Sequence, residues 1–177
     1  MTNRKIILYI ATSIDGFIAD KNGGIDWVGT GAIEETVDTS YEDFYQHVDT
    51  VILGRKTYDQ VTTSLAPDNY PYADSTSYVL TSQLRENKEN IIFTDQSVVD
   101  LVTKLKSEPG KDVFIVGGAS IIQPLVENDL IDEYILATIP VILGEGIPLF
   151  HPLKRAVTLK PVSVNLINQI IYRTYHS

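Results

Sequence analysis

The sequence predicts a three-layer α/β fold, in which helices cover both faces of a mostly parallel sheet. Short apolar runs alternate along the chain with segments of helical periodicity, and no low-complexity linker separates them. The central runs "VIL", "IIF" and "VFIV" are continuously apolar, which is typical of strands covered on both faces. With 177 residues, 44% of them hydrophobic, the chain suits one domain over residues 1–177 better than two.

Strands are expected over residues 5–11, 50–53, 77–80, 90–93, 112–116 and 132–139, with two more in the last twenty residues. Helices are expected over residues 34–47, 97–106 and 119–127. The second and third of these repeat apolar residues every three or four positions. The first is mostly polar, with Val37, Tyr41, Phe44 and Tyr45 toward one side.

Two long loops stand out between these elements. The first covers residues 15–27 and holds three glycines and Trp27, the one tryptophan. The second covers residues 66–77 and holds Tyr70 and Tyr72, with no charge except aspartates. Because long loops in compact domains are often functional, both are candidate parts of a site.

Composition excludes several classes of function. The formal net charge is −9, whereas nucleic-acid binding needs a basic face. There is no cysteine, and His47, His151 and His176 lack ligand spacing, so we expect no metal site. No apolar run approaches the roughly 20 residues of a membrane span. The N-terminal apolar run reads as a strand rather than a signal peptide, so we expect a cytoplasmic protein.

Three predicted strands end in residues suited to phosphate. "ILGRKTYD" (52–59) offers a glycine, two cations and a helix start, "YVLTSQ" (78–83) offers two hydroxyls, and "IVGGAS" (115–120) offers a glycine pair. Each motif alone also has a purely structural interpretation: a solvated loop, a capped turn or close helix packing, respectively. Since all three lie at carboxyl ends of strands, where open α/β sheets bind ligands, their combination favours a phosphate-bearing ligand.

The ordered motifs "ATSIDGFIAD", "IDW", "VILGRKTYD", "YVLTSQ", "FIVGGASII" and "YILATIPVILGEGIPLF" resemble the dihydrofolate reductase superfamily, and most closely its RibD C-terminal-domain-like branch. The similarity runs from about Lys5 to Phe150. It implies a dihydrofolate-reductase-like fold with an antiparallel C-terminal edge, NADPH as cofactor and a homodimer.

The resemblance also implies which residues meet the cofactor. Gly54, Arg55, Lys56 and Thr57 would lie under the adenosine phosphates, and Thr81 and Ser82 near the ribose 2′-phosphate. The pyrophosphate and nicotinamide ribose would face Gly117, Gly118, Ala119, Ser120 and Ile121. Ala11 and Ile18 would line the nicotinamide, and Gly23-Gly24 would let the first loop open and close.

At the positions where the resemblance implies substrate contacts, the sequence differs from both folate reductases and riboflavin-pathway reductases. Residues 68–78 carry no arginine or lysine, where folate reductases bind the glutamate tail with an arginine. "VGTGAIEE" and Val116 stand where riboflavin-pathway reductases carry a serine–alanine–arginine element and a glutamate. The resemblance also implies a proton donor, since folate reductases use one buried carboxylate on the first helix. Counting back to that position from Gly54 reaches Asp38, while counting forward from Trp27 reaches Ala32.

Asp38 is therefore the first candidate acid, with Asp26 and Glu145 behind it. The alternative interpretation of each is a carboxylate at the surface with no catalytic role. A catalytic acid would instead be partly buried and have a raised pKa. Trp27 matches a tryptophan near the reacting ring, or else anchors the loop by packing.

Our hypothesis is an NADPH-dependent reductase that transfers hydride to a C=N or C=O bond of a small heterocycle, pterin-like or aminopyrimidine-like. One alternative is an NADP(H)-binding module without catalysis. Another is a broad-specificity detoxifying reductase, in which the Tyr70 and Tyr72 loop would suit aromatic substrates.

Overall fold

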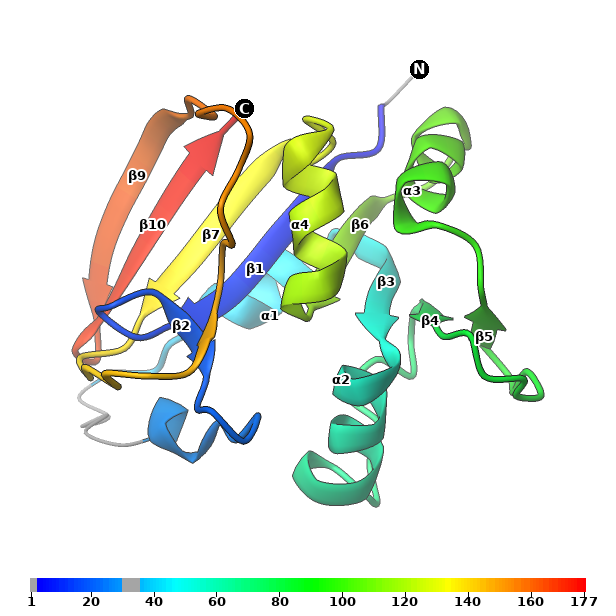
Figure 1. Ribbon diagram of the computed structural model, residues 1–177, viewed down its shortest axis with the longest axis horizontal. Helices are drawn as coiled ribbons and strands as arrows, with labels where there is room; N and C mark the ends of the chain where they lie inside the picture. Colours follow the sequence, from blue (N-terminus) through cyan, green and yellow to red (C-terminus); the bar gives the residue numbers. More distant parts are fainter. Residues whose placement is uncertain (1–2, 30–35) are drawn as a thin grey trace.

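A computed structural model describes residues 3–29 and 36–177 (Figure 1). Its main feature is an eight-stranded sheet in the order β5-β4-β3-β6-β1-β7-β10-β9. The strands from β5 to β7 pair in parallel, whereas β10 runs antiparallel to both β7 and β9. The predicted mostly parallel sheet with an antiparallel C-terminal edge is therefore confirmed.

The strands lie close to their predicted positions. The bounds in the main sheet are β1 Ile6–Thr12, β3 Val48–Gly54, β4 Thr76–Leu80, β5 Ile91–Thr94, β6 Asp112–Gly117, β7 Glu133–Thr138, β9 Lys160–Ile167 and β10 Ile170–His176. A separate small sheet pairs β2 (Phe17–Ala19) with β8 (Ile147–Pro148). The loop predicted over residues 15–27 therefore contains a short strand, because β8 offers it a partner from the far end of the sequence.

Helices cover both faces of the sheet. Figure 1 shows α4 (Ala119–Glu127) in front of the sheet and α1 (Ser40–Tyr45) behind it, and α3 (Val98–Ser107) packs with α4. Ile52 of β3 lies in the core beneath α3 and α4, while its neighbours Val51 and Leu53 face the aromatic core on the other side. This alternation is what a strand buried on both faces requires.

The remaining helical segments extend from the ends of strands. α2 (Arg55–Gln60) follows β3 directly and continues into a π-helical turn, η2 (Val61–Leu65). A short 3₁₀ turn, η1 (Asp26–Gly29), ends the first long loop. Within the described part of the chain, no helix has the length and apolar character needed to cross a membrane.

The prediction of a helix over residues 34–47 is wrong in extent. α1 covers only Ser40–Tyr45, and part of the predicted segment lies outside the described residues. Val37, expected on the packed side, is 89% exposed. Asp38 accepts a 2.9 Å hydrogen bond from the Ser40 backbone N–H. Such local side-chain bonding offers the backbone an alternative to helical pairing and favours a helix start at this point.

The second long loop is packed rather than open. Tyr70 and Tyr72 lie against the aromatic core that Phe114 shares, and the Tyr70 hydroxyl lies 2.8 Å from Ser77 Oγ. Tyr72 is buried, with ring contacts to Tyr70 and Phe114. Of the two tyrosines expected to suit an aromatic substrate, Tyr72 lines the cavity described below and Tyr70 is not among its lining residues. Both rings are stabilised where they pack, because they leave water.

Candidate functional site

A cavity of about 1070 Å³ opens where the parallel strands end. Its walls come from the carboxyl ends of β1, β3, β4 and β6 and from the first turns of α2, α3 and α4. Every residue predicted to bind cofactor lines it: Ala11, Ile18, Gly54, Arg55, Lys56, Thr57, Thr81, Ser82, Gly117, Gly118, Ala119, Ser120 and Ile121. The fold thus brings together in one place segments that are more than a hundred residues apart.

Glycines allow the walls to approach closely. A Cβ atom built on Gly54 would lie 3.2 Å from Ile121 Cδ1, and one on Gly118 would lie 3.6 Å from Thr57 Oγ1. Gly117 has a φ of +134°, which residues with a side chain rarely adopt. The β3–α2 and β6–α4 junctions therefore pack closely, because each glycine leaves room for a side chain of the other junction.

At one end of the cavity, the Asp59 carboxylate pairs with two arginines. Arg85 binds its carboxylate with both terminal nitrogens, at 2.7 and 3.0 Å, and Arg55 Nη1 lies 3.2 Å from Oδ2. The hydrogen bonds from Arg85, followed by those from Arg55, lower the pKa of Asp59. Because two guanidinium groups share one carboxylate, this end of the cavity keeps net positive charge.

Hydroxyls form a further wall. Thr81 and Ser82 follow β4 and line the cavity with Ser97, which precedes α3. Thr81 Oγ1 also accepts a 3.0 Å hydrogen bond from the Gln83 backbone N–H, so this side chain stabilises the turn as well. The two interpretations of the "YVLTSQ" motif, a capped turn and a cavity wall, are compatible.

The charge of the lining contrasts with that of the chain. Among the described lining residues there is no aspartate or glutamate, whereas Arg55 and Lys56 are present with His151. The whole chain carries a formal charge of −9. A cationic cavity in an acidic protein is suited to an anionic ligand.

The other end of the cavity is aromatic. Tyr9 of β1, Phe114 of β6 and Tyr72 line it, backed by Phe44 of α1, whose ring centroid lies 4.9 Å from that of Tyr9 and 5.0 Å from that of Phe114. Burial is the largest cause that raises the pKa of Tyr9 to about 12, and the Asp38 charge adds to it. Sequence reasoning missed Tyr9, Phe114, Asp59 and Arg85. A tyrosine near the carboxyl end of an otherwise apolar strand was the available signal for the first of them.

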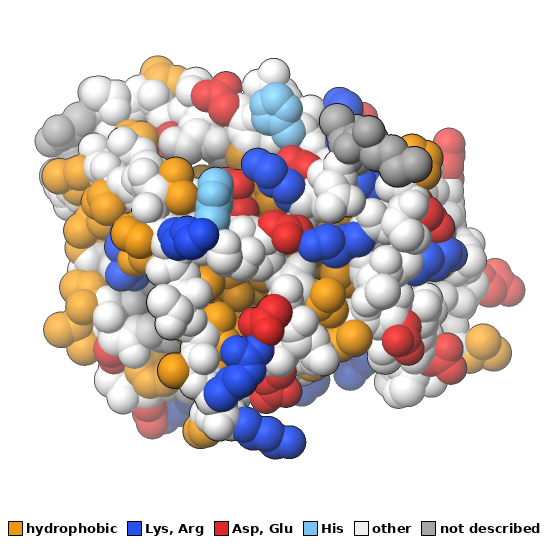
Figure 2. Space-filling view, turned by 90° about the horizontal axis from the view of Figure 1, so that it is seen from above, with side chains coloured by type: hydrophobic (Ala, Val, Ile, Leu, Met, Phe, Trp, Pro, Cys, Tyr) orange, Lys and Arg blue, Asp and Glu red, His pale blue; other side chains and the backbone are white. Residues whose placement is uncertain are grey.

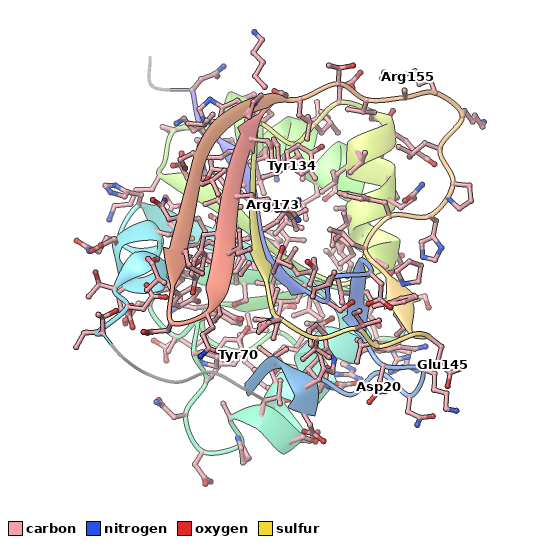
Figure 3. All side chains as sticks on the ribbon, turned by 90° about the vertical axis from the view of Figure 1, so that its left-hand side faces the viewer. Asp20, Tyr70, Tyr134, Glu145, Arg155 and Arg173 are labelled. Carbon is pink, nitrogen blue, oxygen red and sulfur yellow. The ribbon has the colours of Figure 1, made fainter. Side chains whose placement is uncertain are left out.

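The candidate acids lie elsewhere. Asp38, Asp26 and Glu145 are not among the lining residues. Burial of Asp38 opposes its ionisation, but hydrogen bonds from Ser40 and Tyr172 outweigh this and lower its pKa. That direction is opposite to the one we expect of a working acid. Glu145 lies at the surface beside Asp20, where it pairs with Lys21 at 2.9 Å (Figure 3).

Trp27 is buried in η1 and does not line the cavity, although its neighbour Val28 does. Its Nε1 donates a 3.2 Å hydrogen bond to the Gly24 carbonyl oxygen. Gln60 of α2 donates a 3.0 Å hydrogen bond to the Gly23 carbonyl oxygen, which ties the first loop to the far wall. No cluster of three or more histidine, aspartate or glutamate side chains suited to a metal occurs in residues 3–29 or 36–177.

Comparison with known proteins places the chain among reductase-fold proteins. The model of the family described as RibD C-terminal domain matches residues 4–171. Uncharacterized protein YwjB of Bacillus subtilis (strain 168) is 42% identical over 173 residues, which is 97% of each chain. A putative riboflavin biosynthesis protein from Shewanella sp. PV-4 is 30% identical with a TM-score of 0.85, over 97% of this chain and 98% of its own.

A more distant structure has the same fold. The dihydrofolate reductase of Enterococcus faecalis, complexed with NADP(H) and RAB-propyl, is 19% identical with a TM-score of 0.59, over 97% of this chain and 95% of its own. The dihydrofolate-reductase-like fold predicted from the sequence motifs is confirmed by these similarities.

Proposed function

This chain belongs to the RibD C-terminal domain family, and from that premise we propose that it is an NADPH-dependent reductase of a small heterocyclic substrate. The observation that carries the proposal is the lining of the cavity. Residues suited to phosphate converge there from three strand ends, and no carboxylate of the described lining opposes them.

The residues present fit a dinucleotide phosphate. Arg55 and Lys56 supply cations, Thr81 and Ser82 supply hydroxyls, and Gly54 and Gly117 leave the backbone accessible. Charge-assisted hydrogen bonds from arginine are the strong contacts to phosphate, so Arg55 would favour NADPH over NADH. Bound NADPH would supply a hydride, that is, two electrons and one proton, and solvent would supply the second proton.

The contribution of the chain is to align the two rings and to exclude water. Ala11 and Ile18 offer an apolar wall beside the glycine pair. The Gln60–Gly23 hydrogen bond holds the first loop over the same space. Alignment in a dry site lowers the barrier without any residue taking part covalently.

Calorimetric titration of the full chain with NADPH and with NADH tests the proposal. Saturable binding with NADPH preferred is expected, and Trp27 fluorescence should report the same event because Val28 beside it lines the cavity. Absence of NADPH binding at millimolar concentration would overturn the proposal.

The second candidate is an NADP(H)-binding module without chemistry. It is favoured by the absence of a carboxylic acid from the described lining residues. Such a module would bind NADPH tightly and fail to oxidise it with any pterin, pyrimidine or quinone.

We also propose that the chain forms a homodimer through β9. This strand is the edge of the main sheet, and its Val164 and Leu166 are 68% and 72% exposed on the same side. No charged residue occurs between Val162 and Ile167. Figure 2 shows hydrophobic side chains gathered on the left, which is the side of β9 in Figure 1. An uncharged edge segment such as residues 162–167 is suited to pairing with another chain, here a second copy.

A further inference from the structure

The cavity has two chemically different ends, and the cofactor accounts for only one. The end at α2 carries Arg55 and Lys56. The other lies on the α1 face of the sheet, where Tyr9, Tyr72 and Phe114 form its wall. The ring of Phe114 stands edge-on to Tyr72, with centroids 6.1 Å apart and planes at 83°. A wall of aromatic rings favours a flat, apolar ligand.

Among the described lining residues, no charged side chain lies at this aromatic end. The lining cations Arg55 and Lys56 belong to α2, and His151 follows β8 near α4, where its backbone N–H donates to Gln123. Asp38, the nearby carboxylate, accepts hydrogen bonds from Ser40 and Tyr172 and lies outside the cavity lining. Among the described residues, a phosphate or a glutamate tail would therefore find no cation at this end and would lose hydration without compensation.

Two phenol hydroxyls are available there. Neither the Tyr9 nor the Tyr72 hydroxyl forms a hydrogen bond with another described residue. The Tyr72 side chain is buried and that of Tyr9 is half-buried. Burial raises the pKa of both groups, that of Tyr9 to about 12. Both hydroxyls therefore remain protonated near neutral pH and act as donors.

We infer that the aromatic end binds an uncharged planar ring bearing carbonyl oxygens, such as a quinone or a conjugated ketone, and that the Tyr9 and Tyr72 hydroxyls donate hydrogen bonds to those oxygens. The inference rests on the reductase activity of the proposed function, because only a reductase would use such an acceptor, and it extends the substrate from heterocycles to carbonyl-bearing planar rings in general. Reduction adds one hydride to the acceptor and one proton to its oxygen. Since the phenols stay protonated, that proton comes from water, and the two tyrosines orient the substrate and stabilise negative charge on its oxygen.

Binding of 2-methyl-1,4-naphthoquinone to the cofactor-free chain tests the inference without involving NADPH. Calorimetry on the wild type, Tyr9→Phe, Tyr72→Phe and the control Tyr175→Phe would give four dissociation constants. Tyr175 lies on β10 and is not a lining residue. Each of the two cavity variants should raise the Kd about fivefold to tenfold, the effect of one lost hydrogen bond. The control should leave it unchanged.

A second ligand, dihydrofolate, and the kinetics of NADPH oxidation distinguish the inferred ligand class from the alternatives. Dihydrofolate should bind more weakly than the naphthoquinone, and NADPH oxidation by the quinone should show a raised KM in Tyr9→Phe with unchanged NADPH affinity. Tighter binding of dihydrofolate, or an unaltered Kd in both folded tyrosine variants, would overturn the inference. Because NADPH binding is measured separately, its failure would overturn the proposed function and leave the quinone titration to decide the ligand class.

Discussion

The Tyr172 hydroxyl donates a 2.6 Å hydrogen bond to Asp38 Oδ2, which joins β10 to the turn before α1 across 134 positions of sequence. Ser40 binds the other carboxylate oxygen through its backbone N–H and its hydroxyl. Asp38 is therefore an ionised residue that stabilises the entry to α1, rather than a proton donor held neutral by burial.

Substituting Asp38→Asn should lower the free energy of unfolding at pH 7 by about 1 kcal/mol, a modest value because the group is partly exposed. The pKa of Asp38 is lowered in the folded chain, so its stabilising contribution is present above the unfolded pKa near 4 and is lost as the pH falls through the folded value. Urea unfolding at pH 7 and pH 3 measures the change. Asp95→Asn, at an exposed position after β5, is the control. An equal loss at both pH values would contradict this role.

Substituting Arg55→Ala should weaken NADPH binding by roughly 1.5–3 kcal/mol and change NADH binding little, because the lost contact is a charge-assisted hydrogen bond to phosphate. Asp59 would remain paired with Arg85, so the fold should persist. Calorimetry with both cofactors measures the effect, and Lys104→Ala on the exposed face of α3 is the control. Equal losses for NADPH and NADH would show that Arg55 contacts another part of the cofactor.

Substituting Gly117→Ala should lower the free energy of unfolding by about 1–3 kcal/mol and weaken NADPH binding. The added Cβ would have space, since its nearest neighbour, Ile10 Cδ1, lies 3.9 Å away. The cost arises from the φ of +134°, which alanine rarely adopts. Gly29→Ala is the matched control, because its Cβ meets nothing within 4 Å and its φ is not in that range. Similar unfolding curves for the two variants would refute the argument.

Sedimentation of the wild type should give a particle twice the 19.7 kDa mass of the chain. Leu166→Glu should convert it to a monomer, because each copy would bring a carboxylate into the apolar pairing of β9. Leu84→Glu adds the same charge at another exposed leucine and should leave the dimer intact. A wild-type particle of 19.7 kDa would refute the homodimer.

Local patterns were enough to predict much of this molecule. The helix over residues 119–127 is observed with those bounds, and the glycine pair before it lines the cavity. Both features depend on neighbours in sequence: apolar periodicity specifies a helix face, and glycine permits a close approach. Because parallel strands share one carboxyl edge, strand-end motifs converge wherever the sheet places those strands.

Tertiary structure decided what depends on contacts between distant residues. The pairing of Arg85 with Asp59, 26 positions apart, and that of Asp38 with Tyr172 leave no periodic signal. The same is true of Tyr9 and Tyr72, which line one cavity and belong to one aromatic cluster with Phe114. A carboxylate or a phenol acquires its role from burial and from its partners, and both are set by how the elements pack. Sequence alone therefore determined the fold and predicted the strand-end residues that line the cavity, whereas packing decided which side chains share its aromatic end.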